Sequence, residues 1–335
     1  MTATAVLPHV LSLASADEFL GDRKNRFFGE GFKRVTHVLT DITVRPTALG
    51  IPGRIDATAG VRIPGTWSRK GESHQRPHLS TIDAMAFAAQ LTGLYLAHTR
   101  GLGRQDSFVV RSLSIKAGSA PDEDGLDRFP AHAQHIATGP ADRPGHQLTV
   151  TDCRIGSLTV RVEAEHTDSA VQAGSDGTYG VPEFLPGPWN DAPFGASHHG
   201  RHQLLRDIRA DGVAHTASAR LDITTDIEGT RPAAQPPTMI DLFTACLQLG
   251  QILLYRLDGV DRATSNTLWM RRTTISPVPA HAADDGRLRV ELAKPTELPT
   301  EDGVWRAAKI TAGYAGMALT CHVAHRLPAL AAPAS

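Results

Sequence analysis

The chain has 335 residues, enough for two compact units of about 150 residues each. Its 34 basic and 35 acidic residues balance, which excludes a global field that would hold nucleic acid or an anionic membrane. Three cysteines lie far apart and fit neither a disulfide framework nor a zinc cluster. The N-terminus lacks the basic start of a signal peptide, and no stretch approaches the roughly eighteen apolar residues of a membrane span. These features predict a soluble protein of the reducing cytoplasm.

The first distinctive segment is "RFFGEGFKR", residues 26–34. Its cations Arg26, Lys33 and Arg34 could grip a phosphate, and Gly29 and Gly31 would allow the close backbone approach that such a site uses. A solvated basic turn whose phenylalanines close the end of a folded unit would explain the same residues. The sequence leaves both interpretations open.

A long helical run follows at residues 80–101, after strand-like segments at 34–44 and 53–63. The run is apolar nearly all the way round, so this helix must be surrounded by protein. Alternating segments at 108–117 and 157–166 come next. Strands, one buried helix and more strands predict an antiparallel sheet that curls around a single helix.

The second half of the chain repeats this order. Asp83 and Gln90 in the first helical run have counterparts in Asp241 and Gln248, each 158 positions later. A repeat this long, with drift confined to loops, indicates a duplicated structural unit. The matching segments are a helical run at 238–259 and strand-like segments at 200–210, 214–226, 268–277 and 316–325.

We therefore predict an α+β fold, a tandem (double) hot-dog in which each unit is an antiparallel sheet wrapped around one long buried helix. The first unit spans 1–170 and includes the basic motif, a Gly, Pro and Ser-rich linker spans 171–198, and the second unit spans 199–335. The two units could pack as an internal pseudo-dimer within a monomer, and further dimerisation stays open.

Both helical runs start with S/T-x-x-D, which is a capping-box-like beginning with an acid in the first turn. Capping alone would explain Asp83 and Asp241. Gln90 and Gln248 lie on nearly the same helix face as these acids, because two helical turns take about 7.2 residues. This polar stripe either supports the surrounding sheet or lines a pocket.

The residues ahead of the two helices differ. "SHQRPHLS" brings His74, Arg76 and His78 to the first helix, whereas "RPAAQPPT" brings Arg231 to the second. A histidine can transfer protons near neutral pH, and free N–H groups at a helix start can polarise a thioester carbonyl. We therefore favour the first helix start as the catalytic location, with solvent-facing loop histidines as the alternative.

The segments "LGDRKNRFFGEGFKRV" and "HLSTIDAMAFAAQL" resemble the AvrD family, the bacterial avirulence D proteins linked to syringolide production. More distantly, the chain is similar to hot-dog proteins that make γ-butyrolactone signals of the A-factor type. The resemblance implies an acyltransferase that joins a β-ketoacyl group, delivered as a thioester on acyl carrier protein or CoA, to a small sugar-derived alcohol such as xylulose or its phosphate. The product could then cyclise to a butenolide or lactone.

The resemblance places Arg26, Lys33 and Arg34 in the basic motif and His78 and Asp83 at the first helix start. Neither a cofactor nor a metal is expected, because the His-x-x-His pairs fall in strands, where their side chains point to opposite faces. A thioesterase or hydroxyacyl dehydratase, and a non-catalytic acyl-binding protein, are the alternatives. The predicted catalytic residues are Asp83, His78 and Gln90, and the predicted substrate-binding residues are Arg26, Lys33, Arg34, Arg76, Asp241 and Gln248.

Overall fold

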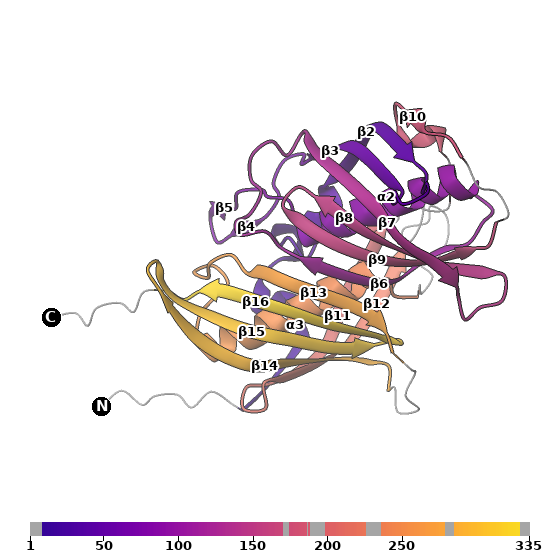
Figure 1. Cartoon of the computed structure of the whole chain (residues 1–335). Coiled ribbons are helices and arrows are strands. Elements are labelled where there is room, and N and C mark those ends of the chain that lie inside the picture. Colours follow the sequence, from indigo (N-terminus) through magenta and orange to yellow (C-terminus); the bar gives the residue numbers. More distant parts are fainter. Residues whose placement is uncertain are drawn as a thin grey trace, which may run out of the picture.

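The computed structural model describes residues 9–169, 174–185, 187, 198–225, 236–278 and 285–328. Its main feature is one antiparallel sheet of 14 strands, in the order β1-β11-β12-β14-β15-β16-β13-β6-β9-β8-β7-β3-β2-β10. Two long helices pack against it, α2 (Thr81–Arg100) and α3 (Met239–Asp258) (Figure 1). Among the described helices, none combines the length and apolarity that crossing a membrane requires.

Helix α2 packs against the part of the sheet that we call the first half-sheet, and its burial on nearly all sides follows from its apolar sequence. Six long strands of this half-sheet contact the helix. They are β2 (Thr36–Arg45), β3 (Arg54–Arg62), β6 (Phe108–Lys116), β7 (Phe129–Pro140), β8 (His146–Ile155) and β9 (Leu158–Thr167).

Helix α3 is similarly buried against the second half-sheet. Its long strands are β11 (Arg201–Asp211), β12 (Thr216–Thr225), β13 (Trp269–Pro277), β14 (Arg287–Thr300), β15 (Gly303–Tyr314) and β16 (Met317–Arg326). The two half-sheets meet where β13 pairs with β6, from Arg272 opposite Lys116 to Ile275 opposite Leu113. The expectation of an antiparallel sheet packed on long buried helices is confirmed.

The strand order reads as a mirror image about the β13-β6 pair, because each strand of one half-sheet has its counterpart at the same distance from the centre. Irregularities repeat as well. Asp41 in β2 and Asp207 in β11 both have left-handed backbones, with φ of 53° and 49°, at matching bulges. A left-handed aspartate is uncommon, so its recurrence 166 positions later is a specific likeness between the halves.

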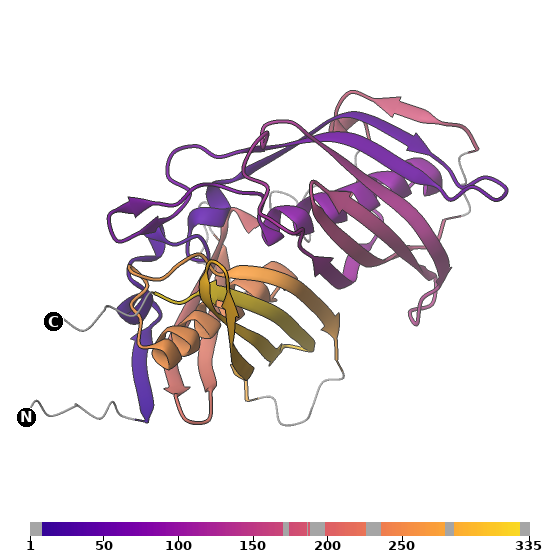
Figure 2. The same ribbon diagram turned by 60° about the vertical axis from the view of Figure 1, so that its left-hand side comes forward.

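Two short strands depart from the predicted division of the chain. Strand β1 (Val10–Ser15), which belongs to the predicted first unit, pairs with β11 of the second half-sheet. Strand β10 (Gly177–Tyr179), from the predicted linker, pairs with β2 of the first half-sheet. The pairing is reciprocal, because the strand that precedes each half-sheet in the chain pairs with the other half-sheet. In Figure 2, indigo β1 lies beside the salmon strands of the second half-sheet. Linker residues 171–173, 186 and 188–197 lie outside the described residues.

The segment between β1 and β2 is built from short helices. They are α1 (Asp17–Leu20) and two 3-10 turns, η1 (Arg23–Asn25) and η2 (Gly31–Arg34). A small hairpin of β4 (Arg69–Lys70) and β5 (Ser73–His74) precedes α2, and a further 3-10 turn, η3 (Pro182–Phe184), follows β10. The Lys70 ammonium donates to the carbonyl oxygen of Ser265, so the hairpin contacts the loop after α3.

Candidate active site

Asp83 is the structural centre of the α2 start. The Ser80 hydroxyl accepts a hydrogen bond from the Asp83 amide at 3.1 Å, and the Asp83 carboxylate accepts from the Ser80 amide at 2.8 Å. This is the capping box that the sequence predicts. The other carboxylate oxygen lies 2.8 Å from Nε2 of His37 on β2, so the buried Asp83 is already occupied by two partners.

His37 was not among the site residues predicted from the sequence. A signal for it was present, because the strand-like segments around His37 and Gln203 match at a separation of 166 residues. Gln203 proves to be a partner of Asp241, just as His37 is a partner of Asp83.

A pocket of about 350 Å³, which we call the α2 pocket, lies in front of this helix start. Its wall includes His78, Ser80 and Thr81 from the first half and Trp269 and Met270 from the second. The amide N–H of Thr81 has no acceptor among the described residues, as is usual in the first turn of a helix. The α2 pocket therefore combines a free helix N–H group with a histidine.

His78 is half-buried and packs edge-on against the Trp67 ring, with centroids 4.6 Å apart. Burial lowers the pKa of His78 below its ordinary value of 6.5, and a backbone hydrogen bond and the charges of Asp83 and Glu123 oppose that shift. The imidazole is therefore neutral at pH 7 and able to accept a proton. Asp83 does not line the α2 pocket, so His78 is the better-placed base.

The cations of the basic motif have separate positions. Arg34 donates to the carbonyl oxygens of Thr66, Lys24 and Trp67, at 3.0, 3.3 and 3.4 Å, which ties the motif to its neighbouring loop. Lys33 is buried, with its ammonium 3.1 Å from Glu30, and burial lowers its pKa. Neither residue lines the α2 pocket.

Arg26 is the cation of the motif that reaches the second half. It is 3 % exposed, donates to the Gln248 side-chain oxygen at 2.7 Å and pairs with Asp17. Two predicted binding residues, one from each half, are thus brought into contact. The glycines of the motif serve this packing, because a side chain at Gly29 would meet the backbone of Arg23, and one at Gly31 would meet the backbone of Trp67.

Two further predicted residues lie at the edges of this arrangement. Arg76 borders the α2 pocket with a largely exposed side chain, 2.7 Å from both Glu123 and Asp124. Gln90 is half-buried on α2 and has no hydrogen bond within the part of the chain that the structure describes. Its predicted catalytic role therefore gains no support from geometry.

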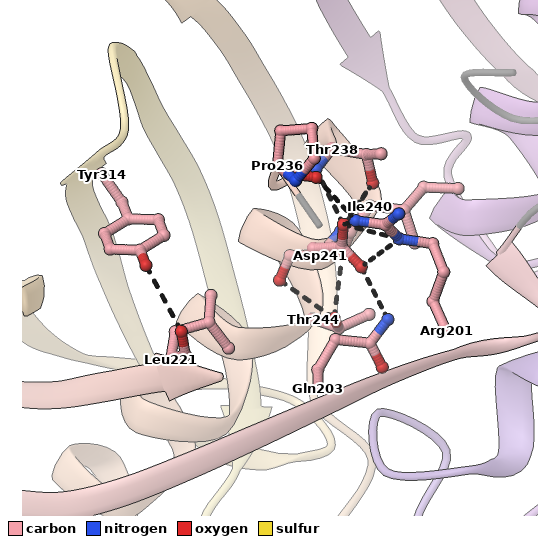
Figure 3. A network of polar contacts seen from close by, with 9 residues as sticks. All are labelled: Arg201, Gln203, Leu221, Pro236, Thr238, Ile240, Asp241, Thr244 and Tyr314. Carbon is pink, nitrogen blue, oxygen red and sulfur yellow. Dashed lines mark hydrogen bonds and ion pairs between the residues drawn. The ribbon is translucent and has the colours of Figure 1, made fainter. Parts of the chain in front are cut away.

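The start of α3 has the same capping box and different partners. Asp241 is fully buried and accepts hydrogen bonds from Arg201 at 2.6 to 3.2 Å, from the Gln203 amide at 2.7 Å and from the Thr238 backbone at 2.7 Å (Figure 3). Arginine stays charged at any physiological pH, so this carboxylate is permanently compensated. Such a carboxylate is poorly suited to bind a substrate. Arg231, the basic residue that the sequence places ahead of α3, lies outside the described residues.

No group of three or more His, Cys, Asp or Glu side chains is placed to hold a metal ion within the described ranges. All three cysteines are buried free thiols, and burial raises the pKa of Cys153 and Cys321 to about 12. A thiol with so high a pKa is inert as a nucleophile near neutral pH.

The fold and the pocket define an α+β protein whose candidate site lies at the start of a buried helix. The family model described as "Pseudomonas avirulence D protein (AvrD)" matches residues 11–328. The chain therefore belongs to the AvrD family. A search of curated proteins found no match.

Three solved structures illustrate the similarity of the chain to known proteins. The tesB protein of Mycobacterium avium subsp. paratuberculosis is 11% identical, covering 81% of this chain and 92% of its own, with a TM-score of 0.38. The 12:0-ACP thioesterase from Umbellularia californica is 12% identical, covering 82% and 98%, with a TM-score of 0.38. A trans-AT PKS dehydratase domain from Brevibacillus brevis is 12% identical, covering 85% and 96%, with a TM-score of 0.32. TM-scores this low do not establish a common fold.

Proposed function

We propose that the protein is an acyltransferase that moves a β-ketoacyl group from a thioester to the hydroxyl of a small sugar-derived alcohol, such as xylulose or its phosphate. The observation that carries the proposal is the meeting of a neutral histidine, His78, and the free N–H of Thr81 at one pocket. A helix N–H group polarises a carbonyl, and a neutral imidazole accepts a proton, so the two halves of an acyl transfer have candidates in the same place.

In the proposed reaction, His78 takes the proton of the acceptor hydroxyl while the oxygen of that hydroxyl attacks the thioester carbon. The resulting oxyanion is stabilised by the N–H of Thr81. The carbon–sulfur bond then breaks, and His78 returns the proton to the departing thiolate. An ester and a thiol form without a cofactor, and the ester could then cyclise to a butenolide or lactone.

We also propose that each half of the chain is a hot-dog unit, so that the whole is a tandem hot-dog with the first unit near residues 1–170 and the second near 199–335. The mirrored strand order and the matching bulges at Asp41 and Asp207 support this division. Strands β1 and β10 would then be exchanged between the units. A cytoplasmic location, where carrier-bound acyl groups are made, fits the proposal.

The test is to incubate the purified chain with a β-ketoacyl thioester, with and without xylulose or xylulose 5-phosphate, and to follow thiol release and product mass. We expect acceptor-dependent thiol release and the mass of an acyl ester. His78→Gln should lower kcat by about 10²- to 10⁴-fold, the usual contribution of a general base. His322→Gln, an exposed histidine on β16, is the matched control and should leave the rate unchanged.

Other outcomes point to the alternative functions. Thiol release without an acceptor would indicate a thioesterase. Loss of water from a hydroxyacyl thioester would indicate a dehydratase. Saturable acyl binding without any reaction would indicate a non-catalytic acyl-binding protein, and it would overturn the proposed chemistry.

A further inference from the structure

A second, smaller pocket of about 60 Å³, which we call the junction pocket, lies between the basic motif and the second half. Arg26, Trp67 and Lys70 line it from the first half, and Gln251 and Arg262 from the second. Its volume equals that of about four water sites. It shares with the α2 pocket six lining residues, which are Gln75, His78, Ser80, Thr267, Leu268 and Met270.

Three cations line the junction pocket, and their acidic partners are few. Lys70 donates to the Ser265 carbonyl at 3.0 Å, to its hydroxyl at 3.3 Å and to the Asn266 carbonyl. Arg262 donates to the Asn25 carbonyl at 3.3 Å and to the Ser68 hydroxyl at 3.5 Å. These acceptors are all uncharged.

Among the described residues, Asp17 is the carboxylate that pairs with one of these three cations. It contacts Arg26 and also contacts Arg23. The cationic charge at the junction pocket thus exceeds its acidic compensation. Buried charge without a counter-ion is costly, so an anion in the pocket would be favoured.

Two buried N–H donors at the junction pocket lack an acceptor. They are Nε of Arg26 and Nε1 of Trp67, and neither has a hydrogen-bond partner in the described part of the chain. Buried donors in proteins are nearly always paired, so donors left open around a cavity indicate a ligand that carries acceptors. An oxyanion supplies acceptors and negative charge together.

The pKa values of the lining cations agree with an excess of positive charge. Burial and, to a smaller degree, the charge of Arg262 lower the pKa of Lys70 to about 7. The same two causes lower the pKa of Arg26 to about 10, although the charge of Asp17 opposes them. Burial also lowers the pKa of Arg262 itself. A bound anion would reverse these shifts, because it favours the protonated forms.

We propose that the junction pocket binds the phosphoryl group of a phosphate monoester through Arg26, Lys70 and Arg262. The assignment of this monoester to the acceptor rests on the proposed function, whereas the anion site does not. His78 lines both pockets, so a hydroxyl of the same small molecule can extend into the α2 pocket. The phosphate of a pantetheine arm lies at the far end of that arm from the thioester, which fits a site beside the reacting centre less well.

The proposed site differs in its residues from the phosphate site that the sequence predicts. Arg26 stays in the phosphate-binding set, while Lys33 and Arg34 do not line the junction pocket. Lys70 and Arg262 take their place. Lys70 lies on the hairpin before α2, and Arg262 lies in the loop after α3.

The first test is calorimetric titration of the full chain with inorganic phosphate and glycerol 3-phosphate, with glycerol as the neutral control. We expect saturable binding of both phosphates and none of glycerol. Arg262→Met should weaken binding at least about tenfold, as loss of one charge-assisted contact predicts. Arg161→Met is the matched control, because Arg161 is an exposed arginine that pairs with Asp152 and lines neither pocket.

A second readout separates binding from structural damage. At pH 8 a Lys70 with a pKa of about 7 is mostly neutral, so binding of a phosphate dianion should take up a proton. Titration in buffers of different ionisation enthalpy measures this uptake. Lys70→Met should abolish the uptake, whereas Arg161→Met should retain it.

The outcomes distinguish this proposal from the proposed function. Absence of saturable phosphate binding, or binding that Arg262→Met and Lys70→Met leave unchanged, would overturn the anion site. Phosphate binding without acyl transfer would keep the site and overturn the acyltransferase. Binding of 4′-phosphopantetheine with Lys70-dependent proton uptake, and no binding of glycerol 3-phosphate, would overturn the assignment to the acceptor.

Discussion

Asp83 and Asp241 show how neighbouring side chains change what a buried carboxylate can do. Both cap equivalent helices through the same two hydrogen bonds. His37 faces Asp83 from β2, whereas Arg201 and Gln203 face Asp241 from β11. Histidine can be neutral or charged near pH 7 and arginine cannot, so the two positions differ in their capacity to exchange protons.

Arg201→Met should lower the free energy of unfolding by about 3–5 kcal/mol, because it leaves the Asp241 charge buried without its partner. Urea unfolding of the full chain measures the change. Arg76→Met removes an exposed arginine with two surface partners and should cost no more than about 1 kcal/mol. Equal effects of the two substitutions would contradict the central role of the Arg201–Asp241 pair.

The pH dependence of acyl transfer should report His78. A base must be deprotonated, so kcat/KM should fall as the pH drops through a value below 6.5, in line with the lowered pKa. Glu123→Gln removes a charge that raises this pKa and should move the acid limb to still lower pH. Asp124→Asn changes another acid that pairs with Arg76 and should leave the limb in place. An acid limb above 6.5 would exclude His78 as the base.

The basic motif, residues 26–34, packs between the two halves and contacts α3 of the second half. Its 3-10 turns fold back so closely that the backbones of Arg23 and Trp67 occupy the space where side chains of Gly29 and Gly31 would stand. Phe28 extends from the motif to Phe243 of α3, with ring centroids 5.9 Å apart. The motif thereby positions Arg26 at the junction pocket.

Gly31→Ala should lower the free energy of unfolding by about 1–3 kcal/mol, because the added methyl group meets backbone that cannot rotate away. It should also weaken phosphate binding, since Arg26 would shift with the motif. Gly139→Ala is the control, because a side chain at Gly139 on β7 meets nothing within 4 Å. Chemical denaturation and phosphate titration of both variants check the prediction, and a Gly31→Ala protein as stable as the control would contradict it.

In the molecule as a whole, strands β1 and β10 link the two halves, because each pairs with the half-sheet of the other half. Strand β1 covers the outer edge of β11, which would otherwise present unpaired N–H and C=O groups. Five residue pairs, from Val10 with Asp211 to Ser15 with Arg206, make this contact. The edge of the second half-sheet therefore depends on the N-terminus of the first half.

Deletion of residues 1–15 should lower the unfolding midpoint and promote self-association through the bared β11 edge. Deletion of residues 1–8 alone keeps β1 and should leave both properties close to those of the full chain. Size-exclusion chromatography and thermal unfolding compare the two truncations. A monomeric, equally stable 1–15 deletion would show that β1 does not protect this edge.

The sequence predicts features whose signals are local. The long apolar runs and S/T-x-x-D starts located α2 and α3 to within one residue at each end, because capping and helix burial depend on neighbouring residues. The long strands β7, β8, β14 and β15 were not predicted. In β7 and β14 an internal proline, Pro130 and Pro295, interrupts the alternation.

Contacts across strands and loops could not be predicted in this way. The partners His37 and Arg201 reach their aspartates only through sheet register, which no single segment encodes. Lys70 and Arg262 meet at the junction pocket because a hairpin of one half touches a loop of the other. The three backbone carbonyls to which Arg34 donates are likewise invisible in sequence.

The reciprocal pairing of β1 and β10 also bears on how such a chain could have evolved. If the halves are duplicated units, as proposed above, a single ancestral copy would have had its leading strand paired with the body of a second molecule, as in an intertwined homodimer. Gene fusion would then have joined two copies that already depended on each other. Once both copies lay in one gene, each could mutate alone, so that one helix start now holds an Arg–Asp pair and the other a His–Asp pair.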